Sequence, residues 1–564
     1  MADHPSERPL EVVRSAARGR RRDIAVGSVF VMLHQASEAL VPIVIGLAID
    51  RAVATGDGAA LVRWIAVFAA VFGFLTTAGL VGYYTLERAQ LWIAHDVRQL
   101  VVARVLDPRG GIHDRPGDVV SLASDDAETV GAVSWSLGLG LGAIPALIGG
   151  TAFLLVTSVP LGLVVVVGVP VVVAAVGVLS RPLVGRSEQE QAAAAAAAGT
   201  ATDLLGGLGV VKGLGAEEAA AARYRNDSRR SLTARLRAAR FFAGYEGATI
   251  GVSGLLLVLV AWIGGRLAVD GDITIGELVA AVGLAQFLIG PLSLLVEAGG
   301  LAASVRAAGR RVRTLVERPV DVDDTSDHRP TDRAGAPALR LAGVASGPLR
   351  SIDLDVATGS VIGVVAEPAE ATEILRMLGR RRDPTDGAVE VFGTLAADWP
   401  IDELRDRVMV CSHDSTLFDG SVREQVSVRA IDQERVDAAI TAATVTEVAE
   451  KLRDGLDSSV GERGRRLSGG QRQRVVLARA LAADTDVLVL HDPTTAVDAT
   501  TEHVIAERFA RLRRNRSTTV VVTTSPALLA VCDEVVVIAD GSVSQRGTHA
   551  DLLDDAGYRE RVLR

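Results

Sequence analysis

Lysine is almost absent from this sequence, which contains only Lys212 and Lys451. Any motif that requires a lysine at a fixed place is therefore excluded unless one of these two residues provides it. Cysteine is equally scarce, since Cys411 and Cys532 are the only two. We place both in the cytosol, where thiols stay reduced, and interpret neither as a metal ligand. Aromatic residues make up only 4 % of the chain, so no aromatic cage for a ligand stands out.

An excess of positive charge is also missing. The formal net charge is −9, so the chain lacks the basic footprint of a nucleic-acid-binding protein, and we expect no nucleic-acid partner. Apolar residues are abundant, at 49 % of the chain. They form six segments, each near the ~20 residues that a lipid bilayer requires, which predicts a membrane protein. These segments lie at about 25–49, 60–85, 131–156, 159–180, 246–269 and 275–302.

The connections between these segments alternate in length. The short ones, 50–59, 157–158 and 270–274, are predicted to lie outside the cell. The long ones, 86–130 and 181–245, hold most of the arginines and are predicted to be helical and cytosolic. We therefore expect a multi-pass protein of the cytoplasmic (inner) membrane with both termini in the cytosol.

The predicted domains follow from these changes in composition. An arginine-rich cytoplasmic segment at 1–24 precedes a six-helix transmembrane domain at 25–316. Residues 317–337, rich in Pro, Asp and Thr, are predicted to form a linker. Residues 338–564 have the pattern of a soluble α/β domain. Its strands are predicted at 361–365, 407–411, 487–490, 518–523 and 534–538.

A glycine-rich turn in the α/β domain opens a helical run that ends near Ala483. The turn reads Leu467-Ser468-Gly469-Gly470-Gln471. The Ser468 hydroxyl, the two glycine N–H groups and the positive end of the helix dipole would together form an anion site. A serine before two glycines is also an ordinary helix N-cap, and this turn alone does not decide between the two interpretations.

The longer string does decide, because Leu-Ser-Gly-Gly-Gln with Gln-Arg two residues later resembles the signature of ATP-binding cassette (ABC) proteins. The neighbouring strings 460–464 and 487–494 agree with this resemblance. It implies an all-α six-helix transmembrane domain of the ABC exporter type joined to an α/β, P-loop-NTPase-like nucleotide-binding domain. Residues 117–126 and 203–218 are similar to the two cytoplasmic coupling regions of such exporters.

In this family the signature does not serve its own chain, but closes on the γ-phosphate of an ATP held by a facing domain. The resemblance thus implies ATP and Mg²⁺ at a composite site formed with a partner. The residues of this chain that would contact that ATP are Leu467, Ser468, Gly469, Gly470, Gln471 and, in the turn that follows the next strand, Asp498.

The P-loop of this chain is degenerate. A P-loop reads Gly-x-x-x-x-Gly-Lys-Ser/Thr between a strand and a helix. The three glycines of the family fall here on Ala366, Ala369 and Ala371, where alanine resists the positive φ that such loops need. The lysine falls on Thr372 and the magnesium-binding hydroxyl on Glu373, and the glutamates of this loop would repel phosphate.

The other elements of this chain's own ATP site are altered as well. His491 stands where the magnesium-associated aspartate belongs, and Asp492 replaces the catalytic glutamate. His413 occupies the Q-loop position, and Thr524 replaces the switch histidine. Two histidines without a third ligand are weak grounds for a metal site, so we expect none.

The motifs that serve the partner's ATP are therefore kept, and those that hold this chain's own ATP are lost. This division predicts the degenerate half of a heterodimeric ABC transporter, which hydrolyses ATP only with a second half that carries an intact P-loop and catalytic Glu. Transport across the membrane is expected to run outward. Two alternatives stay open: an importer of siderophores or other small molecules with the same fold, and an ATPase-inactive membrane scaffold or regulatory protein.

Candidates for the substrate path lie in the first span. Ionisable residues inside a membrane are costly and often functional, which singles out His34 and Glu38, together with Gln35 between them. His34 and Glu38 lie four residues apart on one helix face, so they could equally form a structural pair. The substrate itself, whether lipid, peptide, siderophore or drug, is not specified by these residues.

Overall fold

The computed structural model describes residues 10–324, 330–413, 415–430 and 432–563. Residues 1–9 of the predicted N-terminal segment and 325–329 of the predicted linker lie outside the described residues. The chain divides into two compact units. The helical unit runs up to Arg104 and includes Asp114–Glu317, and the sheet unit consists of Val105–His113 and Arg318–Arg564.

The helical unit contains six helices that are long and apolar enough to cross a membrane, within the described part of the chain. They match the six predicted segments, so that prediction is confirmed. Its helices are α1 Leu10–Gly19, α2 Arg21–Ala48, α3 Gly58–Val105, α4 Pro116–Ser121, α5 Ala127–Gly131, α6 Val133–Thr157, α7 Val159–Gly206, α8 Leu208–Gly213, α9 Glu217–Asp270 and α10 Ile275–Val316.

Small residues let these helices approach closely, as is usual where helices pack inside a membrane. A Cβ atom on Gly46 of α2 would lie only 2.4 Å from the Gly276 carbonyl oxygen of α10. Asp50 stabilises the same contact between α2 and α10, because its carboxylate accepts hydrogen bonds from the Gly276 N–H (2.8 Å) and the Thr274 hydroxyl (2.5 Å). The end of α2 is thereby tied to the start of α10.

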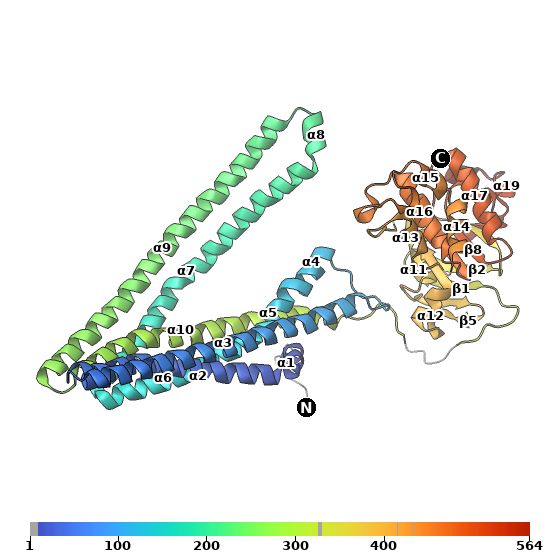
Figure 1. The fold of residues 1–564 in the computed structure, drawn as a ribbon. Helices are drawn as coiled ribbons and strands as arrows, with labels where there is room; N and C mark the ends of the chain where they lie inside the picture. The colour runs from blue at the N-terminus through green and yellow to red at the C-terminus, as the bar shows by residue number, and fades with distance from the viewer. Residues whose placement is uncertain (1–9, 325–329, 414, 431, 564) are drawn as a thin grey trace. The chain divides into compact units, whose positions relative to one another are not determined.

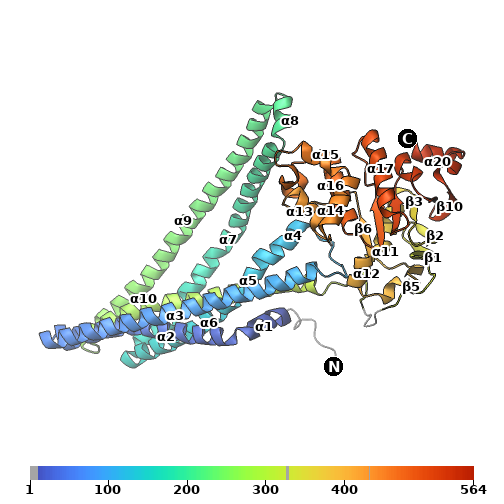
Figure 2. The ribbon, with the colours of Figure 1, turned by 45° about the vertical axis from the view of Figure 1, so that its right-hand side comes forward.

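Helices α7 and α9 lie side by side along most of their length and are joined through α8 (Figures 1 and 2). They contain 48 and 54 residues. At a rise of 1.5 Å per residue they are roughly 70–80 Å long, more than twice the ~30 Å hydrocarbon thickness of a bilayer. A large part of this helical pair therefore extends beyond the membrane, which confirms that the long connection at 181–245 is helical.

The sheet unit is built on one ten-stranded mixed sheet in the order β5-β4-β1-β2-β10-β9-β3-β8-β7-β6. All five predicted strands are present, as β3, β6, β7, β8 and β9. Sequence reasoning missed the other five strands. The strands are β1 Leu339–Ser346, β2 Leu349–Val356, β3 Val361–Val365, β4 Asp386–Val391, β5 Thr394–Leu395, β6 Val408–Cys411, β7 Val487–His491, β8 Thr518–Val522, β9 Glu534–Ala539 and β10 Ser542–Gly547.

Helices and loops cover this sheet, and its central strands are buried on both faces. Strand β3 is buried at every position and pairs in parallel with β8 and β9, while β7 pairs in parallel with β6 and β8. The carboxyl ends of β3, β7 and β8 therefore meet at one edge, where ligands usually bind in such sheets. The helices of this unit are α11 Pro368–Leu378, α12 Ile401–Arg407, α13 Val422–Ser427, α14 Gln433–Ala442, α15 Val445–Glu450, α16 Gly469–Ala482, α17 Ala499–Arg513, α18 Pro526–Ala530, α19 His549–Leu552 and α20 Ala556–Val562.

Candidate functional site

The predicted signature lies at the exposed start of α16. Ser468 is the N-cap: its hydroxyl accepts a hydrogen bond from the Gln471 N–H (3.3 Å), and the Gln471 side chain accepts one from the Ser468 N–H (2.8 Å). This is a capping box. The N–H groups of Gly469 and Gly470 belong to the first helical turn, where no intrahelical acceptor exists. The turn therefore serves as a helix cap and still presents donors to an anion.

The turn before α17 packs directly against this helix start. A Cβ atom on Gly470 would lie 2.5 Å from the Ala496 carbonyl oxygen. Gln473 bridges the two segments, because its side chain donates to the Thr495 hydroxyl and accepts from the Ala496 N–H, both at 2.7 Å. Sequence reasoning gave Gln473 no such role. The signature and the turn that holds Asp498 thus form one surface.

Asp498 is the N-cap of α17. Its carboxylate accepts a hydrogen bond from the Thr501 N–H (3.0 Å), and this bond holds the pKa of Asp498 below its usual value. The side chain is consequently ionised at neutral pH and fixed at the beginning of the helix.

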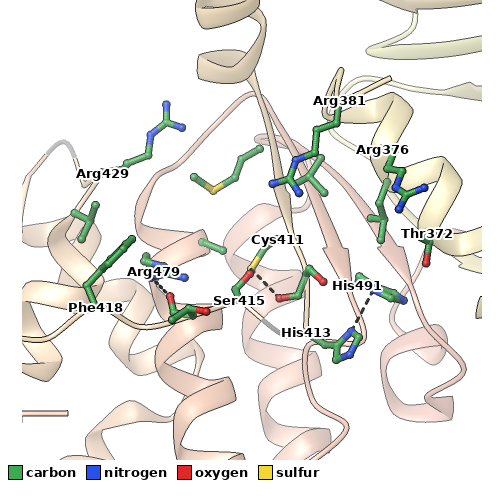
Figure 3. Close-up of a pocket in the computed structure, with 17 residues that line it drawn as sticks. Thr372, Arg376, Arg381, Cys411, His413, Ser415, Phe418, Arg429, Arg479 and His491 are labelled. Carbon is green, nitrogen blue, oxygen red and sulfur yellow. Dashed lines mark hydrogen bonds between the residues drawn. The ribbon is translucent and has the colours of Figure 1, made fainter. Parts of the chain in front are cut away.

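A cavity of about 440 Å³ opens beside the ends of β3, β7 and β8, at the positions predicted for this chain's own ATP site. Six of the predicted positions line it: Ala366, Ala371, His413, His491, Asp492 and Thr524. Thr372 lines a different cavity (Figure 3), and Glu373 is 3 % exposed. The buried Glu373 carboxylate is compensated, because it accepts a hydrogen bond from the Ser346 hydroxyl (2.5 Å) and lies 3.5 Å from Arg376 and 3.4 Å from Arg382.

The segment at the P-loop position is the first turn of α11 rather than a loop. None of its alanines has a positive φ. The Glu367 carboxylate accepts from the Glu370 N–H, and the Glu370 carboxylate accepts from the N–H groups of Glu367 (3.0 Å) and Gly541 (2.8 Å). Two N–H groups at the P-loop position, those of Glu367 and Glu370, thus have the chain's own carboxylates as partners. The Glu-x-x-Glu spacing is a variant of the capping-box pattern, which usually begins with Ser, Thr, Asp or Asn.

Asp492, the acidic residue after the end of β7, already has a hydrogen-bond partner within the chain. Asp492 has a positive φ of 44° and accepts a hydrogen bond from the Thr523 hydroxyl (2.9 Å), a partner that sequence reasoning missed. His491 and His413 lie beside it, with their Nδ1 atoms 3.3 Å apart, so one ring donates to the other (Figure 3). Among the described residues no group of three potential metal ligands is present.

These residues do not fit Mg²⁺–ATP. The cavity contains one cationic side chain among its described lining residues other than the histidines, Arg561, and that guanidinium lies 3.4 Å from the Glu367 carboxylate. The lysine and the hydroxyl that hold phosphate and Mg²⁺ in a P-loop are replaced by residues that face elsewhere. We therefore derive no step of ATP hydrolysis in this cavity.

The candidates in the first span occupy different environments in α2. His34 Nδ1 lies 2.9 Å from the Leu75 carbonyl oxygen of α3, and its Nε2 lies 3.8 Å from the Glu38 carboxylate. The structure thus brings His34 and Glu38 together, and the Glu38 side chain is 44 % exposed. Gln35 is 5 % exposed, and its side-chain oxygen has no hydrogen-bond partner among the described residues.

Aromatic residues extend this polar group across two more helices. The Tyr83 ring of α3 meets His34 edge-on and stacks on Trp135 of α6, with ring centres 5.5 and 5.7 Å apart. Trp135 donates a hydrogen bond to the Glu87 carboxylate (3.0 Å). Sequence reasoning missed this row, since low overall aromatic content does not show that the few aromatics gather at one place.

The chain was compared with known proteins. The family described as "ABC transporter transmembrane region" matches residues 24–292, and the family described as "ABC transporter" matches residues 349–495. The ATP-dependent lipid A-core flippase of Ralstonia nicotianae is 30 % identical over 418 residues, which cover 72 % of this chain and 70 % of the flippase. This chain belongs to the ABC transporter family. It is consequently a multi-pass membrane protein with a domain of a type that binds ATP with Mg²⁺.

Two further proteins are similar to this chain, one in sequence and one in fold. A multidrug efflux ATP-binding/permease protein of Mycobacterium tuberculosis is 32 % identical over 550 residues, which cover 96 % of this chain and 46 % of that protein. The chain thus spans about half the length of this relative. A solved bacterial Atm1-family ABC exporter with ATP bound has the same fold, with a TM-score of 0.75, 23 % identity, and coverage of 96 % of this chain and 98 % of the exporter. The predicted exporter-type fold is confirmed.

Proposed function

We propose that this chain is the degenerate half of a heterodimeric ABC exporter. Its signature, with Ser468, Gly469 and Gly470, would contact ATP and Mg²⁺ held by the P-loop of a second half. That half would also supply the catalytic glutamate. The observation that carries the proposal is a contrast within the sheet unit: the first turn of α11 is capped by Glu367 and Glu370, whereas the signature turn is exposed.

The surface of the helical unit supports a second half as well. Only 17–33 % of the residues in the apolar stretch of each span are buried within this chain. Lipid or another membrane domain would cover the remaining apolar surface. On the distribution of arginine, we place the sheet unit and both termini in the cytosol, in the cytoplasmic membrane.

Outward transport is the direction that the relatives favour, because one is a multidrug efflux protein and another a flippase. An importer with the same fold stays the alternative for direction. The second alternative, an ATPase-inactive scaffold, leaves the exposed signature without a ligand. We therefore prefer an exporter whose ATP is hydrolysed at the composite site.

The test compares the two sides of the sheet unit in a co-purified complex with a half that has an intact P-loop. Ser468→Arg places a bulky cation where a hydroxyl would meet the γ-phosphate. We expect it to lower the ATPase rate about 100-fold or more, the usual cost of losing an oriented donor at a transferring group. Asp492→Asn should change the rate less than twofold, because no ATP is held beside it.

Ser421→Arg is the matched control. Ser421 is the N-cap of α13 and forms the same kind of capping box, with Glu424, at the start of a different helix. This variant measures the cost of losing a cap without touching the proposed composite site. If Asp492→Asn is as damaging as Ser468→Arg, this chain's own site is active. If neither variant changes the rate, the scaffold is the better description.

A further inference from the structure

Five side chains of the helical unit form one chain of contacts that involves three helices. His34 and Glu38 belong to α2, Tyr83 and Glu87 to α3, and Trp135 to α6. The contacts run from Glu38 through His34, Tyr83 and Trp135 to Glu87, so that aromatic rings lie between two carboxylates. We refer to these five residues as the aromatic–carboxylate group.

The group is held in place by its own contacts. Gly79 of α3 lets the His34 ring approach, because a Cβ atom there would lie 2.9 Å from His34 Nδ1. The Tyr83 and Trp135 rings are stacked, with 18° between their planes, and the hydrogen bond from Trp135 to Glu87 fixes the second ring. A ligand would therefore meet rings that are already oriented, which lowers the entropy cost of binding.

Part of the group is open at the surface of this chain. The Glu38 side chain is 44 % exposed, Glu87 is exposed, and Tyr83 and Trp135 are half-buried. Apolar lipid tails on this surface would leave the two carboxylates uncompensated, which is costly inside a membrane. A ligand that carries positive charge would remove that cost.

Arg88, the neighbour of Glu87 in the sequence, already has a carboxylate of its own. Its guanidinium donates a hydrogen bond to Asp23 of α2 (2.7 Å). The charge of the group itself comes from Glu38, Glu87 and, when it is protonated, His34. The two carboxylates would repel an anion, and a neutral ligand would leave them without a counter-charge.

We propose that the aromatic–carboxylate group binds a lipophilic organic cation as the cargo of the exporter proposed above, and this inference rests on that function. The faces of Tyr and Trp rings attract a cation, most strongly where water is excluded. The carboxylates supply the opposite charge, and the rings supply apolar area for the rest of the molecule. An inorganic cation would make no use of this apolar area.

The position of the group along the spans suits a cargo that arrives from the cytosol. Glu87 lies two residues beyond the apolar segment 60–85, and Trp135 lies four residues after the start of the segment 131–156. Both positions are at the cytosolic ends of their spans in the predicted orientation. A cation bound here would therefore be at the start of an outward path.

The test measures binding to the purified full chain in phosphatidylcholine nanodiscs, without ATP or a partner half. The two probes are tetraphenylphosphonium and tetraphenylborate, which have the same shape and opposite charge. Binding is measured by equilibrium dialysis, with empty nanodiscs as the reference for partition into lipid. We expect saturable binding of tetraphenylphosphonium, whereas tetraphenylborate should only partition as it does into empty nanodiscs.

Four variants assign the binding to this group. Glu87→Gln keeps an oxygen that can accept from Trp135 and removes only the charge, and it should weaken binding about tenfold. Tyr83→Leu removes a ring and should also weaken binding about tenfold, whereas Tyr83→Phe keeps the ring and should stay within about twofold. Glu38→Gln removes the other carboxylate, so the test stays decisive if one of the variants does not fold.

Two control variants remove the same kinds of group elsewhere. Glu434→Gln removes an exposed carboxylate of α14 in the sheet unit. Trp262→Leu removes a 65 % exposed ring in the outer part of the span formed by α9. Both should leave the affinity for tetraphenylphosphonium unchanged.

Three results would overturn the proposal. They are the absence of saturable tetraphenylphosphonium binding, equal saturable binding of tetraphenylborate, and binding that the Glu38, Tyr83 and Glu87 variants all leave unchanged. The group would then only pack α2, α3 and α6 together. Because this experiment contains neither ATP nor a partner half, each of these results leaves the heterodimer proposal to its own ATPase test.

Discussion

At the scale of single residues, the two glycines of the signature differ in what surrounds them. A Cβ atom on Gly469 would lie 3.4 Å from the Ala496 Cβ, an ordinary contact, whereas one on Gly470 would lie 2.5 Å from the Ala496 carbonyl oxygen. Gly470→Ala should therefore push α16 away from the turn before α17 and cost about 1–3 kcal/mol of stability. Gly469→Ala should cost well under 1 kcal/mol. Thermal unfolding of the full chain measures both.

The same two variants can be compared for their ATPase rates in the complex, in addition to their stability. Gly470→Ala should also lower its ATPase rate, because Gln473 would lose its bonds to Thr495 and Ala496. Equal losses of stability in the two variants would show that this contact does not hold the signature surface together. The sequence predicted the turn at the start of a helix, since it follows from local residue types; its role as an anion site stays a prediction. The contact with Ala496 could not be predicted, because it joins segments 26 residues apart.

At the scale of elements, α11 is the helix whose start decides whether this chain can hold ATP. Thr372→Lys restores the missing cation, yet we expect it to leave Mg²⁺–ATP affinity unchanged within about twofold. The reason is that the carboxylates of Glu367 and Glu370 still accept from each other's N–H groups and place negative charge at the helix start. Adding Glu367→Ala and Glu370→Ala removes this cap, at a cost of about 1 kcal/mol, and should raise the affinity. Calorimetry on the full chain with and without Mg²⁺ measures this affinity.

If Thr372→Lys alone raises the affinity for Mg²⁺–ATP, the helix cap does not prevent ATP from binding. Sequence reasoning identified these glutamates but treated them only as charges that repel phosphate. Their role as a helix cap could be recognised only once the segment was known to be helical from Pro368.

The sheet shows the same limit of sequence reasoning. The buried parallel strands were predicted from continuous apolar runs, whereas β1, β2, β4, β5 and β10 were missed. The buried residues of β1 and β2 are separated by one or two half-buried or exposed residues, so their apolar pattern is weaker.

At the scale of the whole molecule, a transported substrate has to cross a membrane domain that contains few polar groups. Glu38, partly exposed beside His34, is the candidate that this chain presents to the path. In a reconstituted complex, Glu38→Gln should change substrate transport at least about threefold, since an intramembrane charge is costly to keep without a function. Basal ATPase activity should stay within twofold, because the change lies in the helical unit. Dye efflux and phosphate release from the same vesicles measure the two rates.

Asp272→Asn is the matched control for this last prediction. It removes one carboxylate from the exposed turn between α9 and α10, outside the apolar spans. Its transport should equal that of the unmodified complex. Replacing both His34 and Glu38 by Ala removes the pair as well as the charge. If this double variant transports normally, the two residues only join α2 to α3, and the row formed by Tyr83, Trp135 and Glu87 becomes the next part of the path to examine.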